Sequence, residues 1–284
     1  MEKKQKRLVA VVTGGTKGIG FAIAQTLLEL DFKVVICSRS QKDLKVSSKK
    51  LDPTSTNILG IRADITKEED VENLIKHTIN QFGRIDVLVN NAGTFGPFGP
   101  FETLPWDKVL GNIKVNLLGG MYLCYQVIPH MKQQGSGKII NLSGGGVGGD
   151  TPLMNGAPYY TAKTGIVAFT EVLASELKDF GITVNAILPG RILTDLSKQS
   201  FDIPKDKLGP VLTQATEKLK GGGGESLIPA TNLIAFLVSK KASRLTGKFL
   251  SAKWDSLANL EKSASNNLYN LRRIEGKIYR REKS

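Results

Sequence analysis

The sequence of 284 residues predicts an α/β fold: a single doubly wound parallel sheet of about seven strands with helices on both faces. Two observations lead to this prediction. Short runs rich in Val, Ile and Leu alternate with longer segments of helical periodicity, which is typical of parallel strands joined by crossover helices. The short runs contain few polar residues, as strands do when helices cover both faces of their sheet.

Seven segments have the length and composition of strands: residues 8–13, 33–37, 58–63, 87–90, 138–142, 183–188 and 248–251. Between them, apolar residues recur at helical spacing in residues 18–30, 67–82, 106–132, 158–180 and 226–238. No repeat or linker divides the chain, and the one low-complexity stretch is 221–224. We therefore expect a single domain over residues 1–284. Residues 257–284 form a C-terminal extension that could cover a neighbouring subunit, fold back on its own pocket or be mobile.

The formal net charge of +13 arises from 39 Lys and Arg against 26 Asp and Glu. A dense basic face attracts nucleic acid or membrane surfaces. Apart from the two ends of the chain, however, the basic residues are spread along it, and no nucleic-acid-binding motif accompanies them. We interpret them as solvated faces and expect no nucleic-acid and no membrane partner, because the longest uncharged helical stretch is too short and too polar to span a bilayer.

The cysteines and histidines exclude other classes of site. Cys37 and Cys124 cannot form a disulfide framework, so we expect two buried reduced thiols and a cytoplasmic protein. His77 and His130 lack the spacing of metal ligands or of a hydrolase motif. We expect no metal site.

The first predicted strand runs directly into a glycine-rich turn, residues 13–20, that opens the first predicted helix. Glycines at such a turn let the backbone approach a pyrophosphate, whose charge is stabilised by unpaired N–H groups and the helix dipole. The turn therefore predicts dinucleotide binding on a Rossmann-like sheet. The expected contacts are Gly14, Thr16, Lys17, Gly18, Ile19 and Gly20.

The end of the second predicted strand bears on the choice of cofactor. Proteins that bind NAD usually place an acidic residue there to accept hydrogen bonds from the ribose, but this chain has Ser38 and Arg39. A guanidinium suits a phosphate, and Lys17 could add a second charge. We therefore expect NADP(H) to be preferred over NAD(H), with Ser38 and Arg39 as contacts. The alternative is that Arg39 points into solvent.

Polar and small residues also follow the third and fourth predicted strands, at the edge where open parallel sheets bind ligands. Asp64 and Ile65 are expected to flank an adenine, and Asn90, Ala92 and Gly93 to lie under the dinucleotide. Each motif alone could be a turn in which an Asx side chain bonds its own backbone.

Tyr159 and Lys163 are four residues apart near the start of a predicted helix and therefore lie on one face of it. A free phenol, with a pKa near ~10, is a poor acid or base at neutral pH, but a nearby lysine cation lowers that pKa. The pair then becomes usable for proton transfer. Tyr160 points elsewhere and is expected to be a packing residue.

Together these residues resemble the short-chain dehydrogenase/reductase family, from residue 8 to about residue 255. The motifs that carry the resemblance occur in the family's order: the glycine turn, Asp64, Asn90-Asn91-Ala92-Gly93, Asn116, Ser143, Tyr159-x-x-x-Lys163 and Pro189-Gly190.

The resemblance implies an NADP(H)-dependent oxidoreductase that transfers a hydride between the nicotinamide and a carbonyl or alcohol substrate. It implies Tyr159 as general acid/base, and Lys163 as the residue that lowers its pKa and holds the nicotinamide ribose. Ser143 would hydrogen-bond the substrate oxygen, and Asn116 would anchor a water relay through a local helix distortion. Pro189, Gly190 and Thr194 would lie along the nicotinamide. A homotetramer or homodimer is also implied, through the helices that begin near residues 106 and 158.

The chain departs from the family pattern at one position. A second hydroxyl usually follows the strand at Ser143, but here Gly144 takes that place, and Ser143 precedes Tyr159 by sixteen residues. Either Ser143 serves after a shift of the loop or the site works without this hydrogen bond, and Thr151 is a weaker candidate. The missing hydroxyl also supports an alternative function, a non-catalytic dinucleotide-binding sensor or regulatory protein.

The identity of the substrate and the direction of the reaction stay open. Residues 94–101, 144–156 and 191–225 are expected to wall the substrate pocket, the last of them as a lid.

Overall fold

The computed structural model describes residues 7–147 and 153–262. Within them, a single sheet has seven parallel strands in the order β3-β2-β1-β4-β5-β6-β7. The strands are β1 (Val9–Thr13), β2 (Lys33–Ser38), β3 (Ile58–Arg62), β4 (Val87–Asn90), β5 (Gly137–Leu142), β6 (Ile182–Leu188) and β7 (Phe249–Ser251). The predicted fold class is confirmed, and each predicted strand end lies within one residue of the observed one.

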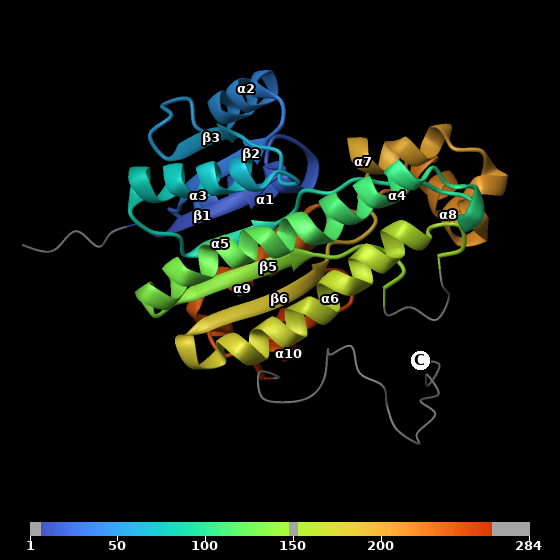
Figure 1. Ribbon diagram of the computed structural model, residues 1–284. Coiled ribbons are helices and arrows are strands. Elements are labelled where there is room, and N and C mark those ends of the chain that lie inside the picture. The colour runs from blue at the N-terminus through green and yellow to red at the C-terminus, as the bar shows by residue number, and fades with distance from the viewer. Residues whose placement is uncertain (1–6, 148–152, 263–284) are drawn as a thin grey trace, which may run out of the picture.

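Helices cover both faces of the sheet (Figure 1). On one face, α1 (Gly18–Glu29) and α9 (Ile228–Val238) share a buried apolar cluster with the strands. On the other face, α3 (Glu68–Phe82), α5 (Gly119–Gln134) and α6 (Ala157–Leu177) share a second cluster. Apolar strand residues point alternately into the two clusters, which explains the nearly continuous apolar runs in the sequence.

Helix α2 (Gln41–Leu51) was not predicted from the sequence. Only Leu44 and Ser47 of this helix are buried, so it lacks the apolar stripe that marks an amphipathic helix. Its start is instead stabilised by Ser40, whose Oγ accepts a hydrogen bond from the N–H of Asp43.

The predicted long helix over residues 106–132 is interrupted. It consists of α4 (Trp106–Ile113), one π-helical turn (Lys114–Leu118) and α5. A single π turn inside an α-helix widens the helix locally and is frequent at functional sites. The expected lid, residues 191–225, contains the helices α7 (Asp195–Lys198) and α8 (Lys205–Lys220).

The described part of the C-terminal extension folds back onto the core of its own chain. It forms α10 (Leu257–Lys262), in which Leu260 is fully buried and Leu257 packs against the α1/α9 cluster. Residues 257–262 therefore cover the core of their own domain and do not line the pocket, a role that differs from the three left open by the sequence. Residues 263–284 lie outside the described part.

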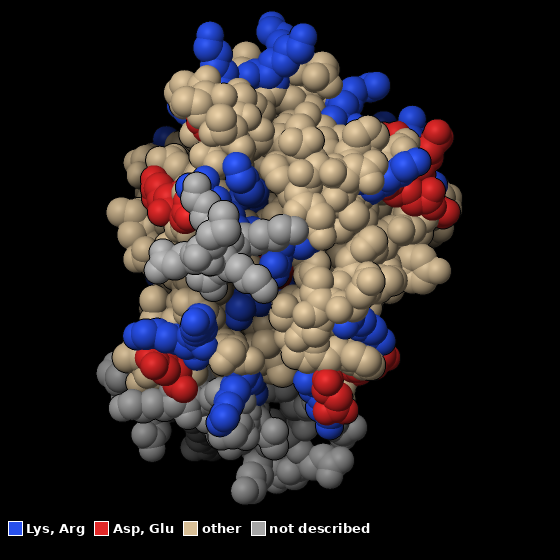
Figure 2. Space-filling view, turned by 90° about the vertical axis from the view of Figure 1, so that its left-hand side faces the viewer, with Lys and Arg blue, Asp and Glu red and all other residues tan. Residues whose placement is uncertain are grey.

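Cys37 and Cys124 are both free and buried, as expected, and burial raises the pKa of each thiol to about 12. No helix within residues 7–147 and 153–262 is long and apolar enough to cross a membrane. On the face shown in Figure 2, Lys and Arg side chains lie at several separate places, some of them beside acidic side chains.

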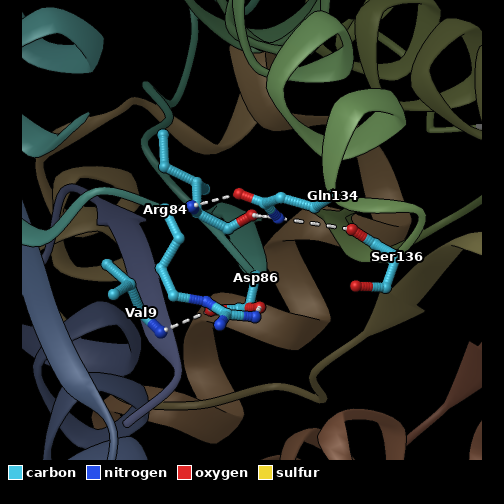
Figure 3. A network of polar contacts seen from close by, with 6 residues as sticks. Val9, Arg84, Asp86, Gln134 and Ser136 are labelled. Carbon is cyan, nitrogen blue, oxygen red and sulfur yellow. Dashed lines mark hydrogen bonds and ion pairs between the residues drawn. The ribbon is translucent and has the colours of Figure 1, made fainter. Parts of the chain in front are cut away.

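A polar network ties β1, β4 and β5 together at the amino-terminal edge of the sheet (Figure 3). The Asp86 carboxylate accepts hydrogen bonds from the Val9 N–H at 2.8 Å and from the Arg84 guanidinium at 2.6 and 2.8 Å. The Gln134 side chain accepts from the Ile85 N–H and donates to the Ile85 carbonyl. Because Asp86 is only 7% exposed, these bonds replace water that the carboxylate cannot reach.

We expect the substitution Asp86→Ala to lower the free energy of unfolding by about 2–4 kcal/mol, because it leaves the Val9 N–H and the partly buried Arg84 cation without their acceptor. Chemical denaturation is the measurement. Glu217→Ala is the matched control, since the Lys205–Glu217 pair has the same 2.6 Å separation but lies in solvent. An equal loss of unfolding free energy in the two variants would contradict the prediction that burial makes the Asp86 contacts stronger.

Candidate active site

A cleft of about 750 Å³ lies at the carboxyl ends of the strands, on both sides of the point where the strand order reverses between β1 and β4. Most of the predicted cofactor contacts line it: Gly14, Thr16, Lys17, Gly18, Ile19, Gly20, Ser38, Arg39, Asp64, Ile65, Ala92, Gly93 and Thr194. Four separate strand ends therefore meet at one surface.

A second cavity of about 370 Å³ adjoins this cleft. The predicted residues that line it are Ser143, Tyr159, Lys163, Pro189 and Gly190. The two cavities share the lining residues Ile19, Asn91, Gly93, Phe95, Thr194 and Leu196. Because they share these walls, the cleft and the cavity lie side by side, with room for a long ligand in the first and a smaller one in the second.

The glycine turn brings the backbone close to the cleft. Gly14 has φ +63°, and a Cβ on Gly20 would collide with the Gly14 carbonyl oxygen and the Asn91 side chain. No side chain caps α1, and its first residues Gly18, Ile19 and Gly20 line the cleft, so the positive end of the helix dipole is directed at the cleft. This arrangement fits a pyrophosphate.

Asn90 does not face the cleft, which corrects the expectation that it lies under the dinucleotide. Its Nδ2 donates to Asn141 Oδ1 at 2.8 Å and to the Gly120 carbonyl at 3.2 Å, inside the core. The adjacent Asn91 was not among the expected cofactor contacts, but it lines both cavities. Its Nδ2 donates hydrogen bonds to the Thr13 and Gly14 carbonyls. Successive residues at the end of a strand point to opposite sides, and the motif alone does not say which Asn faces the cleft.

Arg39 and Asp64 lie close together at the far end of the cleft. Burial would raise the pKa of Asp64, but hydrogen bonds from Thr66 and the charges of Arg39 and Lys67 lower it overall. No ion pair in the described residues engages the Arg39 guanidinium. Lys17 instead pairs with Asp195 of α7 at 3.2 Å, so it links the glycine turn to the lid segment rather than adding a free charge beside Arg39.

Asn116 lies in the π-helical turn and is buried. Its Nδ2 donates to the carbonyls of Thr94 and Asn112, and its Oδ1 accepts from the Thr94 N–H. Asn116 thereby joins the distorted helix to the segment after β4. The side chain is satisfied by the backbone, which explains how an amide is tolerated on an apolar helix. Its role in a water relay stays a prediction.

Tyr159 and Lys163 lie on one face of α6, and both are buried. Lys163 Nζ donates to the Leu142 carbonyl at 3.0 Å and lies 6.0 Å from the centre of the Tyr159 ring. No hydrogen bond within the described residues engages the Tyr159 hydroxyl, which faces the second cavity. Tyr160 packs instead against two buried apolar clusters, one that contains Leu153 and one that contains Val167, as expected of a packing residue.

The pKa values of this pair differ from the expectation. Burial raises the pKa of Tyr159 to about 12, and burial lowers the pKa of Lys163 to about 8. In the protein by itself, desolvation therefore outweighs any stabilisation of the phenolate by the lysine cation, and the phenol keeps its proton at neutral pH.

The hydroxyl of Ser143 donates to the Lys163 carbonyl at 3.0 Å. Its single proton would have to leave this carbonyl before it could be donated to a substrate oxygen. Binding of the substrate by Ser143 stays a prediction, and Thr151 lies outside the described residues.

Two further residues line the substrate cavity within the segments expected to wall it. Phe95 packs edge-on against Tyr159, with ring centres 5.2 Å apart. Glu225 accepts from the Arg191 N–H and pairs with Lys253 at 2.6 Å, which closes one wall. These residues come from distant parts of the chain and share no motif. In the described chain, no three His, Cys, Asp or Glu side chains are grouped so that they could hold a metal ion.

Known proteins resemble this chain over most of its length. A family model described as short chain dehydrogenase matches residues 8–204. The chain is 34% identical over 242 residues to L-fucose dehydrogenase of Oryctolagus cuniculus, covering 84% of this chain and 81% of the relative. It is 35% identical over 242 residues to a 3-oxoacyl-(acyl-carrier-protein) reductase of Staphylococcus epidermidis, covering 84% and 94%.

Solved structures agree. A variant of actinorhodin polyketide ketoreductase with NADPH is similar with a TM-score of 0.77 and 30% identity, over 87% of this chain and 96% of that one. Levodione reductase is similar with a TM-score of 0.75 and 30% identity, over 87% and 95%. With the glycine turn, the doubly wound sheet and the Tyr159/Lys163 pair in place, the chain belongs to the short-chain dehydrogenase/reductase family and is an NAD(P)-dependent oxidoreductase.

Proposed function

We propose that this protein transfers a hydride between NADP(H) and a carbonyl or alcohol substrate, with Tyr159 as general acid/base. One observation carries the proposal: the Tyr159 side chain is buried, its hydroxyl makes no hydrogen bond to described residues, and it lines a cavity that adjoins the dinucleotide cleft. A bound nicotinamide would donate or accept the hydride. Residues of this chain would donate or accept the proton.

In the reducing direction, Tyr159 Oη would donate its proton to the substrate oxygen while the carbon gains the hydride. At a pKa of about 12 the phenol holds its proton at neutral pH, as a general acid must, and stabilisation of the phenolate by the Lys163 cation would have to lower that pKa for efficient donation. Lys163, whose cation lies on the same helix face, would stabilise the phenolate left behind and hold the nicotinamide ribose. Asn116 would support a water relay that returns a proton, and Pro189, Gly190 and Thr194 would border the nicotinamide.

The preference for NADP(H) is proposed from the cleft around Arg39. The guanidinium is exposed at the cleft and engages no ion pair in the described residues, so it is available for a 2′-phosphate. The end of β2 offers no carboxylate to accept from a ribose diol, and Oδ1 of Asp64, at the end of β3, accepts from the Thr66 N–H and hydroxyl.

Accordingly, Arg39→Ala should lower kcat/KM for NADPH by about 10- to 100-fold, the value of one charge-assisted hydrogen bond, and change NADH turnover little. Steady-state kinetics with both cofactors is the measurement. Lys45→Ala removes the same charge from α2 outside the cleft and serves as control. A strong preference of the unmodified protein for NADH would refute the assignment.

The first experiment is a fluorescence titration with NADPH and NADH, followed by oxidation of bound NADPH against a panel of ketones and aldehydes. NADPH binding with turnover supports the enzyme. Tight binding without turnover across the panel would favour the alternative, a non-catalytic cofactor sensor.

We also propose a homo-oligomer. Exposed apolar side chains on α4, α5 and α6 support it, among them Leu110, Tyr125 and Val172. Light scattering would give the mass in solution.

A further inference from the structure

Gly144 follows β5 and contacts the hydroxyl of Tyr159. A Cβ on Gly144 would collide with Tyr159 Oη and would lie 2.9 Å from Cζ and 3.0 Å from Cε1. The backbone at Gly144 is not in the left-handed region, so glycine is not required there by its dihedral angles. What requires glycine at this position is the space that the phenol occupies.

Neighbouring rings hold the Tyr159 side chain in its observed place. Tyr159 is only 8% exposed, and the Phe95 ring packs against it at 74° with centres 5.2 Å apart. Phe95 is itself held by Phe98, at 4.6 Å between ring centres. An added methyl group would therefore displace the Tyr159 hydroxyl rather than find an existing void.

The neighbouring hydroxyl does not fill the same place. Ser143 is buried, and its Oγ is directed to the Lys163 carbonyl in α6. The position beside the phenol is thus the bare main chain of Gly144.

We propose that Gly144 is a positioning residue: by carrying no side chain, it lets the Tyr159 hydroxyl lie against the main chain at the end of β5, the place from which it reaches the reacting oxygen. This inference rests on the proposed function for its catalytic consequence, but not for its geometry. It implies that the glycine is not simply a lost hydroxyl, and that a serine placed there would harm the site.

The decisive variant is Gly144→Ser, compared with Gly144→Ala. Both should lower kcat for carbonyl reduction by roughly 10- to 100-fold, since a displacement near 1 Å of a reacting group has an effect of this size. The affinity for NADPH should stay unchanged in both. Gly83→Ala is the control, because a Cβ on Gly83, at the end of α3 and outside both cavities, has no atom within 4 Å, and this variant should keep its kcat. A Gly144→Ser enzyme as active as the unmodified protein, or more active, would overturn the proposal.

A second measurement does not need a substrate. Gly144→Ala should lower Tm by a few degrees in the unmodified protein, and by less in a Tyr159→Phe background, where the closest atom is removed. Equal shifts in both backgrounds would overturn the contact between Gly144 and the phenol. A different result would contradict the proposed function and leave this contact standing: an unmodified protein that neither binds nor oxidises NADPH.

Discussion

Tyr159→Phe should reduce carbonyl-dependent oxidation of NADPH by about 10²- to 10⁴-fold, the usual contribution of a positioned general acid. The substitution removes one oxygen, and that oxygen has no hydrogen-bond partner among the described residues. The fold and the dinucleotide cleft should therefore be unaffected, and the Kd for NADPH should change little. Single-turnover kinetics with a reactive ketone, alongside fluorescence titration of NADPH, separates the two quantities.

Tyr160→Phe provides the control. It removes the same atom from the adjacent residue, whose ring packs against apolar side chains instead of Lys163. We expect this variant to keep its kcat. Retention of activity in Tyr159→Phe, or equal losses in both variants, would mean that the proton comes from another group.

Lys163→Met should remove activity and at the same time stabilise the fold. Burial lowers the pKa of Lys163 from 10.5 to about 8, so at neutral pH the folded protein holds a cation with one backbone acceptor, the Leu142 carbonyl. A shift of this size corresponds to roughly 3 kcal/mol of unfavourable burial. Allowing for the lost hydrogen bond, we expect a gain of about 1–3 kcal/mol in the free energy of unfolding at pH 7. The loss of kcat should be at least about 10²-fold.

The pH dependence checks the cause of this stability change. Because the pKa of Lys163 is lower in the folded state, the unfolded state binds more protons between pH about 8 and 10.5. The stability of the unmodified protein relative to Lys163→Met should therefore rise across this window and stay constant below it. Denaturation at pH 7, 9 and 10 measures the difference.

Lys138→Met is the matched control for this experiment. Lys138 stands at the other end of the sheet, in β5, and burial lowers its pKa too. Its replacement should also stabilise the fold, and activity should be kept. A Lys163→Met protein less stable than the unmodified one at pH 7 would contradict the prediction that the buried Lys163 cation destabilises the folded state.

Much of the site could be predicted because it depends on local backbone. Gly14 and Gly20 lie in a turn whose close approach only glycine permits, and this requirement is visible as a spacing. The ends of parallel strands share one edge of the sheet, so Ser38, Asp64 and Gly93 could be placed together without coordinates.

Other features depend on contacts between distant segments. Asn91 faces the cleft, whereas the side chain of the adjacent Asn90 points into the core. Helix α2 buries one large apolar side chain, Leu44, and has no apolar stripe. Lys17 forms an ion pair with Asp195, which belongs to no sequence motif that would predict this contact. None of these contacts leaves a periodic signal in the sequence.

The doubly wound sheet, the dinucleotide turn and the Tyr159/Lys163 pair are predictable from the amino-acid sequence, because strand composition, glycine spacing and helical period are properties of neighbouring residues. The environment of that pair depends on the packing of distant segments. Burial raises the pKa of Tyr159 and lowers that of Lys163, and it results from all the segments that pack around the two side chains. The same packing places Gly144 against the phenol, since contact between residues fifteen positions apart is set by how β5 and α6 meet.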